Sequence, residues 1–256
     1  MPDISASTSR GPSAIPTTAE ALARLDMPLQ TAMMTQRAVR RLLPDPVDDV
    51  LVLKCIELAL RAPTGNDGQN WEFIVVKDAR VKEKLAHRYR QAWKVQRDVV
   101  LRHVVAQDES MAKIVASIQW QIDHFTEIPV LVVACLRLGA RDGRLPVVRM
   151  PHVAESAYWG SIYPSVQNLL LAARAMGLGA SLITLPLWSQ TSARAILGLP
   201  RSLTPCCIVP LGWPRGRYGP TTRKPVEQVV HRDAFGNRAW LDTFDRPAGV
   251  RSLRPG

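Results

Sequence analysis

The feature that most constrains the fold of this chain is a helical stretch near residue 170 that is apolar on nearly every side. Its apolar residues recur at steps of three and four and also fill the opposite side of the helix: Val166, Leu169, Leu170, Leu171, Ala172, Ala173, Ala175 and Met176. A helix at the surface of a globular domain carries one apolar stripe, so a helix that is apolar all round is expected to be buried. We therefore predict a central helix that Pro164 begins or kinks and that Gly177 ends in a left-handed conformation.

Apolar runs and turn residues predict the other elements around this helix. Helices are expected at residues 19–42 and 46–60, with two more between 79 and 127 that join near 107–110. Buried strands are expected at residues 71–76, 129–136, 178–185 and 206–211, and a loop at 139–151. At 256 residues the chain is long enough to bury these elements around one large core.

A polar turn at residues 61–71 lies between a predicted helix and a predicted strand. Its polar side chains would contribute nothing to the packing of these two elements. Thr64, Asn66, Gln69 and Asn70 stand in a frame of Pro and Gly, which exposes backbone N–H groups and amide side chains. These groups can bind a flat, polar ligand without adding charge. The alternative is an ordinary surface turn, because the same residue types dominate turns.

Three arginines, Arg37, Arg40 and Arg41, fall near the end of the first predicted helix. Residues three or four apart share one face of a helix, so these guanidinium groups could close on a single phosphate. The alternative is structural, since cations near a helix C-terminus stabilise the helix. A Gly- and Pro-rich loop at residues 212–225 offers another set of cations, which could complete the same clamp.

Taken together, five motifs resemble the FMN-dependent nitroreductase family, and they occur in that family's order between about residue 30 and about residue 240. The motifs are Arg37–Arg40, Ala62–Gly65 with Gln69–Trp71, Pro129–Val133, Val166–Gly179, and Gly212–Pro214 with Arg223. Five motifs in register are strong evidence for the fold and the cofactor, and they say much less about the substrate.

The resemblance implies an α+β fold of three layers, α/β/α, in which helices flank a central, mostly antiparallel sheet. It also implies a homodimer with each flavin between the subunits, and a monomer is the less favoured alternative. The expected organisation is a disordered tail at residues 1–20, an FMN-binding domain at 21–245 and a C-terminal tail at 246–256.

The resemblance further implies that flavin carries the chemistry and that no side chain is catalytic. The implied cofactor-binding residues are Arg37, Ala38, Arg40, Arg41 and Arg223 near the phosphate, Thr64, Gly65 and Gln69 near the ring or ribityl chain, and the backbone of Thr184 and Leu185 at the ring edge. FMN would pass hydride from NADPH or NADH to a nitroaromatic, quinone or similar electron-poor acceptor by a ping-pong exchange. The alternatives are a flavin dehydrogenase or reductive dehalogenase on the same scaffold, or a flavin-binding protein without turnover.

The chain departs from the family pattern at several of these positions. Gln36 and Ala38 stand where the family commonly has Arg and Ser, so the phosphate clamp loses a cation and a hydroxyl. Asp67 stands at a usual Asn, where a carboxylate would repel the electron density of a reduced flavin, and we leave it out of the predicted site. Thr221 stands at a usual Lys, which leaves Arg223 alone in its segment.

Other functional classes lack their signatures in this chain. There is no Gly-x-Ser-x-Gly, His-Glu-x-x-His or Cys-x-x-Cys motif, and the five histidines are scattered singly, so we expect no metal site or nucleophilic triad. The net charge of +11 is spread along the chain without a nucleic-acid-binding motif, so we expect no specific nucleic-acid binding, although non-specific attraction to polyanions stays open.

Location is predicted from apolar runs and cysteine usage. The sequence contains no run of about 18 uncharged apolar residues, so no membrane-spanning helix is expected. The N-terminal residues do not resemble a secretory signal. All four cysteines lie in apolar runs and are expected to be reduced core residues of a cytoplasmic protein, with the adjacent Cys206 and Cys207 on opposite faces of a strand.

Overall fold

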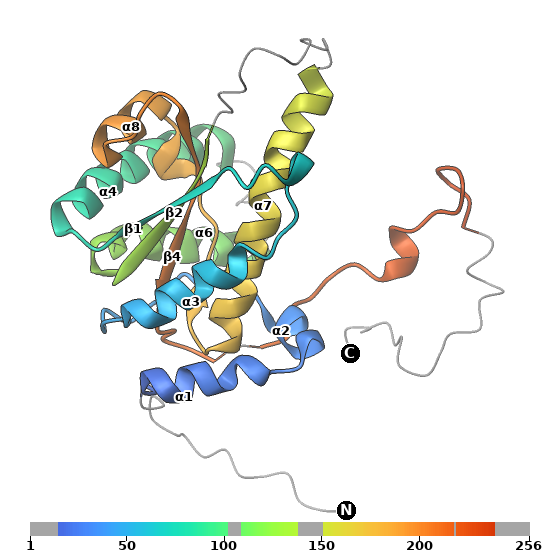
Figure 1. Ribbon diagram of the computed structural model, residues 1–256, viewed down its shortest axis with the longest axis horizontal. Helices are drawn as coiled ribbons and strands as arrows, with labels where there is room; N and C mark the ends of the chain where they lie inside the picture. The colour runs from blue at the N-terminus through green and yellow to red at the C-terminus, as the bar shows by residue number, and fades with distance from the viewer. Residues whose placement is uncertain (1–14, 102–108, 138–150, 218, 239–256) are drawn as a thin grey trace, which may run out of the picture. The chain divides into compact units, whose positions relative to one another are not determined.

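A computed structural model describes residues 15–101, 109–137, 151–217 and 219–238 of the chain (Figure 1). The chain divides into two compact units, Met1–Tyr218 and Gly219–Gly256. The first unit holds the sheet and the longer helices, and the described part of the second holds one short helix, η6 (Val226–Gln228). The expected tails at 1–20 and 246–256 lie largely outside the described residues, so the predicted domain limits stay a prediction.

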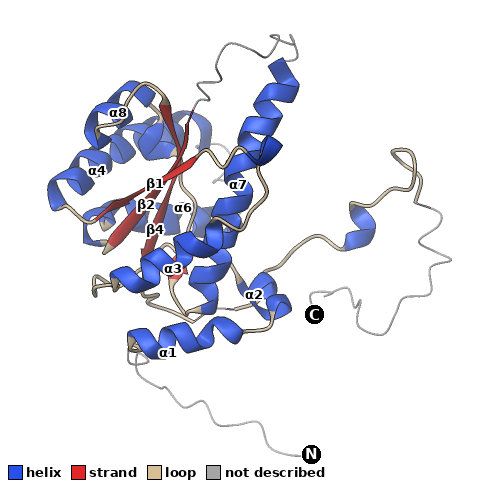
Figure 2. Ribbon diagram, in the orientation of Figure 1, coloured by secondary structure: helices blue, strands red, loops and turns tan. Residues whose placement is uncertain are grey.

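The first unit is built on a four-stranded sheet with the order β1-β2-β4-β3, in which every neighbouring pair is antiparallel (Figure 2). The strands are β1 (Trp71–Val76), β2 (Val130–Arg137), β3 (Gly179–Ala180) and β4 (Leu203–Gly212). The predicted antiparallel sheet is therefore confirmed. The strand expected at 178–185 is shorter than predicted, because the chain leaves the sheet after β3 and returns only through a bridge between Ile183 and Ile208 before the short helix η5 (Leu185–Leu187).

Helices cover both faces of this sheet, as Figure 1 shows. The layer formed by α1 (Thr18–Ala23), α3 (Asp49–Ala59) and α7 (Pro151–Ala175) shares one buried cluster with Val130, Val132, Ala134 and Leu136 of β2. The layer formed by α4 (Ala79–Val95), α6 (Glu109–Asp123) and α8 (Gln190–Leu197) shares the other with Leu131, Val133 and Cys135. Alternate residues of β2 thus pack into the two clusters on opposite faces of the sheet, which confirms the three-layer α/β/α fold.

The apolar helix predicted near residue 170 is the C-terminal part of α7. Its residues Val166, Leu169 and Ala173 are fully buried, as is Met176 directly after it, which confirms the predicted central helix. Pro164 lies inside the helix, because α7 begins already at Pro151. Gly177 has a φ of +86°, the left-handed conformation that was expected after the last turn. The loop predicted at 139–151 falls almost entirely outside the described residues.

The prediction of one long helix at residues 19–42 is wrong. The structure has α1, a short helix η1 (Arg24–Asp26), and α2 (Leu29–Thr35), and the residues after Thr35 are not helical. Pro28 cannot continue a helix from the preceding residues, which is why the helical run divides there. The arginines therefore lie on a non-helical segment, residues 36–41, and the argument that they share a helix face does not apply.

The two helices expected between 79 and 127 are α4 and α6, and the point where they join lies outside the described residues. Helix α4 continues into one turn of π-helix, η3 (Gln96–Leu101). Within the part of the chain that the structure describes, no helix has the length and apolar character needed to cross a membrane.

All four cysteines are buried and free, as predicted. The expectation that Cys206 and Cys207 lie on opposite faces of the sheet is wrong. The register of β2 against β4 shifts between Ala134 and Cys135, so that Cys206 has no partner in the ladder and both cysteines pack into the same core cluster. Pro205, which has no N–H to donate, is paired at this bulge.

Candidate functional site

Arginine side chains surround a depression of about 410 Å³, which we call the arginine pocket. Its lining comes from the segment after α2, from α6 and from the loop after β4: Arg37, Ala38, Val39, Arg40, Arg41, Ser117, Trp120, Pro214, Arg215, Gly216 and Arg217. The structure thus brings together four of the predicted site residues and adds two cations from a distant loop. Its volume is within the range of ligand pockets, about 300–1,000 Å³.

Backbone hydrogen bonds hold the arginine segment against the end of the sheet. Val39 N donates to Ala180 O at 2.8 Å, and Arg215 N donates to Arg41 O at 3.0 Å. The close approach depends on Gly179 of β3, where a Cβ atom would lie 2.7 Å from Leu42 Cδ2 and 2.8 Å from Val39 Cγ1. A side chain larger than hydrogen at this position would push the arginine segment away.

The described lining of the arginine pocket is strongly positive and includes no carboxylate. Among the described residues, none of its five arginines forms an ion pair with an acidic side chain. Arg40 is half-buried, and burial lowers its pKa because the charged form has lost water. Burial also raises the pKa of Tyr89 to about 12, and the positive charge of Arg40 opposes that rise. An anion in the pocket would relieve the desolvation of Arg40.

An aromatic stack fixes one wall of the pocket. The guanidinium of Arg215 lies 5.3 Å from the centre of the Trp120 ring, and the other ring contact of Trp120 is with His124, stacked at 4.0 Å with an interplanar angle of 11°. Arg215 Nε also donates to Leu42 O at 3.4 Å. The stack and this bond restrict the Arg215 side chain, so its remaining N–H groups are held in one region of the wall.

Behind this wall, a buried polar network links α4, α6 and the segment that follows β3. Gln121 Nε2 donates to Ser181 Oγ at 3.0 Å, and Tyr89 Oη donates to Gln121 Oε1 at 3.4 Å. All three residues are buried. The network therefore connects α4 and α6 to the residues that lead to Thr184.

The polar turn is anchored to α7. Gly65 N donates to Ser161 Oγ at 3.1 Å, and Trp71 Nε1 donates to Ser161 O at 2.6 Å. Asp67 and Gln69 both have left-handed backbones, with φ of +49° and +41°, and such strain is common at functional sites. Gln69 Nε2 donates to Asp67 Oδ1 at 2.7 Å, so the carboxylate that we left out of the predicted site orients a residue that we included.

The other predicted residues lie elsewhere. Thr64, Gly65 and Gln69 do not line the arginine pocket of their own chain, nor do Thr184 and Leu185. Thr184 is the exposed residue that precedes η5, and Leu185 packs against the core beside α4. Arg223 belongs to the second unit, where it is exposed and its Nη1 donates to Thr222 O at 2.8 Å.

Sequence reasoning missed several residues that shape the site, namely Ser117, Gln121 and Ser161. Gln121 carried a weak signal, since its amide lies between Trp120 and Ile122 near the end of α6. Ser161 carried none, because its partner Gly65 is 96 residues away along the chain.

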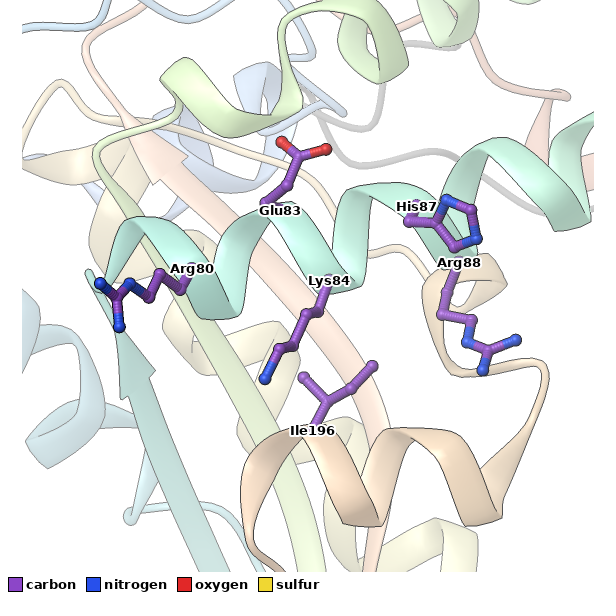
Figure 3. Close-up of a pocket in the computed structure, with 6 residues that line it drawn as sticks. All are labelled: Arg80, Glu83, Lys84, His87, Arg88 and Ile196. Carbon is purple, nitrogen blue, oxygen red and sulfur yellow. The ribbon is translucent and has the colours of Figure 1, made fainter.

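A second depression, of about 670 Å³, lies between α4 and α8 (Figure 3). It is lined by Arg80, Glu83, Lys84, His87, Arg88 and Ile196. Lys84 extends toward Ile196, whereas Arg80 and Arg88 point outward at the two ends (Figure 3). No predicted site residue lines it, and its cations share the lining with the carboxylate of Glu83, so the arginine pocket is the stronger candidate for an anion.

Comparison with known proteins assigns the chain to a family. The profile of the nitroreductase family matches residues 33–213. The chain therefore belongs to the nitroreductase family, and the resemblance inferred from the five motifs is confirmed.

Individual relatives agree with this assignment. A protein of Thermus thermophilus named NADH dehydrogenase is 30% identical, over 78% of this chain and 94% of the relative. An iodotyrosine deiodinase of Daphnia pulex is 23% identical, over 77% of this chain and 63% of the relative. A crystal structure of oxidized iodotyrosine deiodinase bound to FMN and 3-iodo-L-tyrosine shares the fold with a TM-score of 0.63 at 20% identity, covering 81% of this chain and all of that one.

Proposed function

We propose that this protein is an FMN-dependent oxidoreductase that passes hydride from NAD(P)H to nitroaromatic, quinone or similar electron-poor acceptors. The observation that carries the proposal is the arginine pocket, in which five guanidinium groups face one depression without a carboxylate among the described residues. Membership of the nitroreductase family, the FMN in a solved structure of the same fold and the name of the Thermus thermophilus relative support it.

The chemistry of the donors fits a phosphorylated flavin. Arg40 is a half-buried cation, and Arg37 and Arg41 flank it on the same segment. Their guanidinium groups would hold the phosphate by charge-assisted hydrogen bonds. Ala38 lines the same pocket and supplies backbone only. When bound, FMN supplies the two-electron redox chemistry, and the exchange is ping-pong because both substrates use the same place in turn.

The remaining predicted residues would bind the other parts of the cofactor. Thr64, Gly65 and Gln69 present uncharged hydrogen-bonding groups on a turn that Ser161 anchors. Leu185 begins η5, where the first N–H groups of a helix have no partner within it, so its backbone can donate to a ring nitrogen. Arg223 would add a further cation to the phosphate.

We also propose that two copies of the chain assemble around each flavin. The turn with Thr64 and Gln69 does not line the arginine pocket of its own chain, which is compatible with another copy supplying these groups. Apolar side chains that such assembly would cover are exposed on two helices: Leu29 and Met33 on α2, and Val50 and Leu53 on α3. A homodimer would bury them. The reduced, buried cysteines fit a cytoplasmic location.

Anaerobic mixing tests the catalytic proposal. The purified protein with its chromophore should be bleached by NADPH or NADH in the absence of oxygen, and a nitroaromatic or quinone added afterwards should restore the colour. A protein that binds flavin but is bleached by neither nicotinamide would favour the non-catalytic alternative.

The dehalogenase alternative rests on the likeness to iodotyrosine deiodinases in sequence and fold. It is distinguished by the compound that restores the colour. If a halogenated aromatic reoxidises the reduced protein with release of halide, and nitroaromatics and quinones do not, the alternative is the correct function.

A further inference from the structure

The arginine pocket holds more positive charge than one flavin phosphate needs. A phosphate monoester carries a charge of about −1.5 to −2 near neutral pH. The arginine segment alone supplies three guanidinium groups, Arg37, Arg40 and Arg41, and Arg215 and Arg217 add two more. With FMN bound, the pocket would therefore keep a net positive charge.

The two added arginines form a separate group within the pocket. Arg215 and Arg217 lie on the loop after β4, beyond residue 213, where the match to the family profile ends. The Arg215 side chain is restricted by Trp120 and by Leu42 O, whereas Arg217 is exposed and follows Gly216. Neither has an acidic partner among the described residues. The guanidinium of Arg215 is held in place, and that of Arg217 is exposed to solvent. Such a pair suits a ligand that binds and dissociates in each cycle.

We propose that Arg215 and Arg217 bind the ribose 2′-phosphate of NADPH, so that the protein prefers NADPH to NADH. This inference rests on the proposed function, because it presumes that a nicotinamide is the hydride donor. Planar guanidinium forks bind phosphate oxygens in pairs, and an Arg near the ribose is a general way to accommodate this 2′-phosphate. NADH has a hydroxyl at this position and would leave both cations without a partner.

Binding of nucleotide fragments tests the proposal without any turnover. The full-length protein with bound flavin is titrated by calorimetry with 2′,5′-ADP and with 5′-AMP, which differ only in the 2′-phosphate. We expect 2′,5′-ADP to bind at least about tenfold more tightly, a factor that corresponds to about 1.4 kcal/mol. The variants Arg215→Gln and Arg217→Gln, each compared after reconstitution with excess FMN, should lose most of that difference.

Lys84→Gln is the matched control, because it removes one charge from the second depression and leaves the arginine pocket intact. It should retain the full preference for 2′,5′-ADP. Equal binding of the two fragments to the unmodified protein, or an unchanged preference in both arginine variants, would overturn the proposal.

The ratio of KM values separates this inference from the proposed function. A KM for NADPH well below that for NADH, with a ratio that moves toward one in Arg217→Gln, supports both. Equal KM values for the two nicotinamides overturn the inference and leave the function standing. If neither nicotinamide bleaches the flavin while the fragment preference persists, the binding assignment stands and the proposed function fails.

Discussion

Gln121 Nε2 donates to Ser181 Oγ at 3.0 Å although both residues are buried, so a polar contact crosses the core between α6 and the segment after β3. The other end of the same amide accepts from Tyr89 Oη. Buried polar groups are costly unless they are paired, and here one amide satisfies two hydroxyl groups. The network therefore fixes how α6, which contributes Trp120 to the arginine pocket, lies against the segment that leads to Thr184.

Replacement of this amide should destabilise the fold. In Gln121→Leu, both hydroxyl groups lose their partner inside the core, and the free energy of unfolding should fall by about 1–3 kcal/mol for each unsatisfied group. Urea unfolding measures the effect. Because Ser181→Ala removes one of those groups, the double variant should lose less stability than the sum of the single variants. Strictly additive losses would show that the contact is not energetically coupled.

Gly179→Ala should displace the arginine segment. The added Cβ would lie 2.7 Å from Leu42 Cδ2 and 2.8 Å from Val39 Cγ1, and such overpacking costs about 1–3 kcal/mol. We expect lower stability and weaker flavin binding, measured by thermal unfolding and by flavin fluorescence. Gly160→Ala is the control, because a Cβ there meets nothing within 4 Å and Ala favours the helix. If Gly179→Ala behaved like the control, the close approach would not position the arginines.

Ser161→Ala should loosen the polar turn without disturbing α7. The substitution removes the hydroxyl that accepts from Gly65 N, while the backbone carbonyl that binds Trp71 remains. We expect a loss of about 1 kcal/mol in stability together with weaker flavin binding. Ser165→Ala offers a matched comparison, since the Ser165 hydroxyl bonds only to Ile162 O within the same helix. Flavin affinities that fall equally in both variants would contradict a specific role for Ser161.

Stability should decrease at alkaline pH because of the buried thiols. Burial raises the pKa of Cys55 and of Cys135 to about 12, and that of Cys206 to about 11. In the unfolded chain these thiols titrate near about pH 8.5, so above that pH the unfolded state has lost protons that the folded state keeps. Their contribution is therefore complete below about pH 8.5 and declines as the pH rises toward the folded values.

Urea unfolding at about pH 8 and about pH 10 measures this decline. The variant Cys55→Ala should show a smaller decrease between the two values, because one titrating group is gone. A free energy of unfolding that stays constant or rises over this range would be inconsistent with protonated thiols in the core.

The elements that depend on local pattern could be predicted from the sequence, and those that depend on distant partners could not. The buried part of α7 and the strands β1 and β2 follow from apolar residues at helical or continuous spacing. The conformation of the arginine segment depends instead on Ala180 and Arg215, which bond to it from far along the chain. The residues after Pro28 have helical propensity, and nothing in their local sequence indicates that Ala180 and Arg215 bond to this segment.

The candidate site shows the same division. Arg37, Ala38 and Arg40 were predicted from a family motif and Arg41 from the adjoining basic cluster, and the structure places all four around one pocket. Trp120 contacts Arg215 through the packing of α6 against the loop after β4, and the sequence does not indicate that tertiary contact. The bulge at Cys206 likewise depends on how β4 pairs with β2.

The most direct test of the account is the binding of FMN to the flavin-free protein and to its Arg40→Ala variant. We predict that the unmodified protein takes up one FMN per chain, and that Arg40→Ala weakens binding by at least about tenfold while Lys84→Gln does not, because a lost charge-assisted contact is worth more than about 1.4 kcal/mol. Circular dichroism would establish that the variants remain folded. A folded protein that fails to bind FMN, or one whose affinity is the same with and without Arg40, would contradict the central claim.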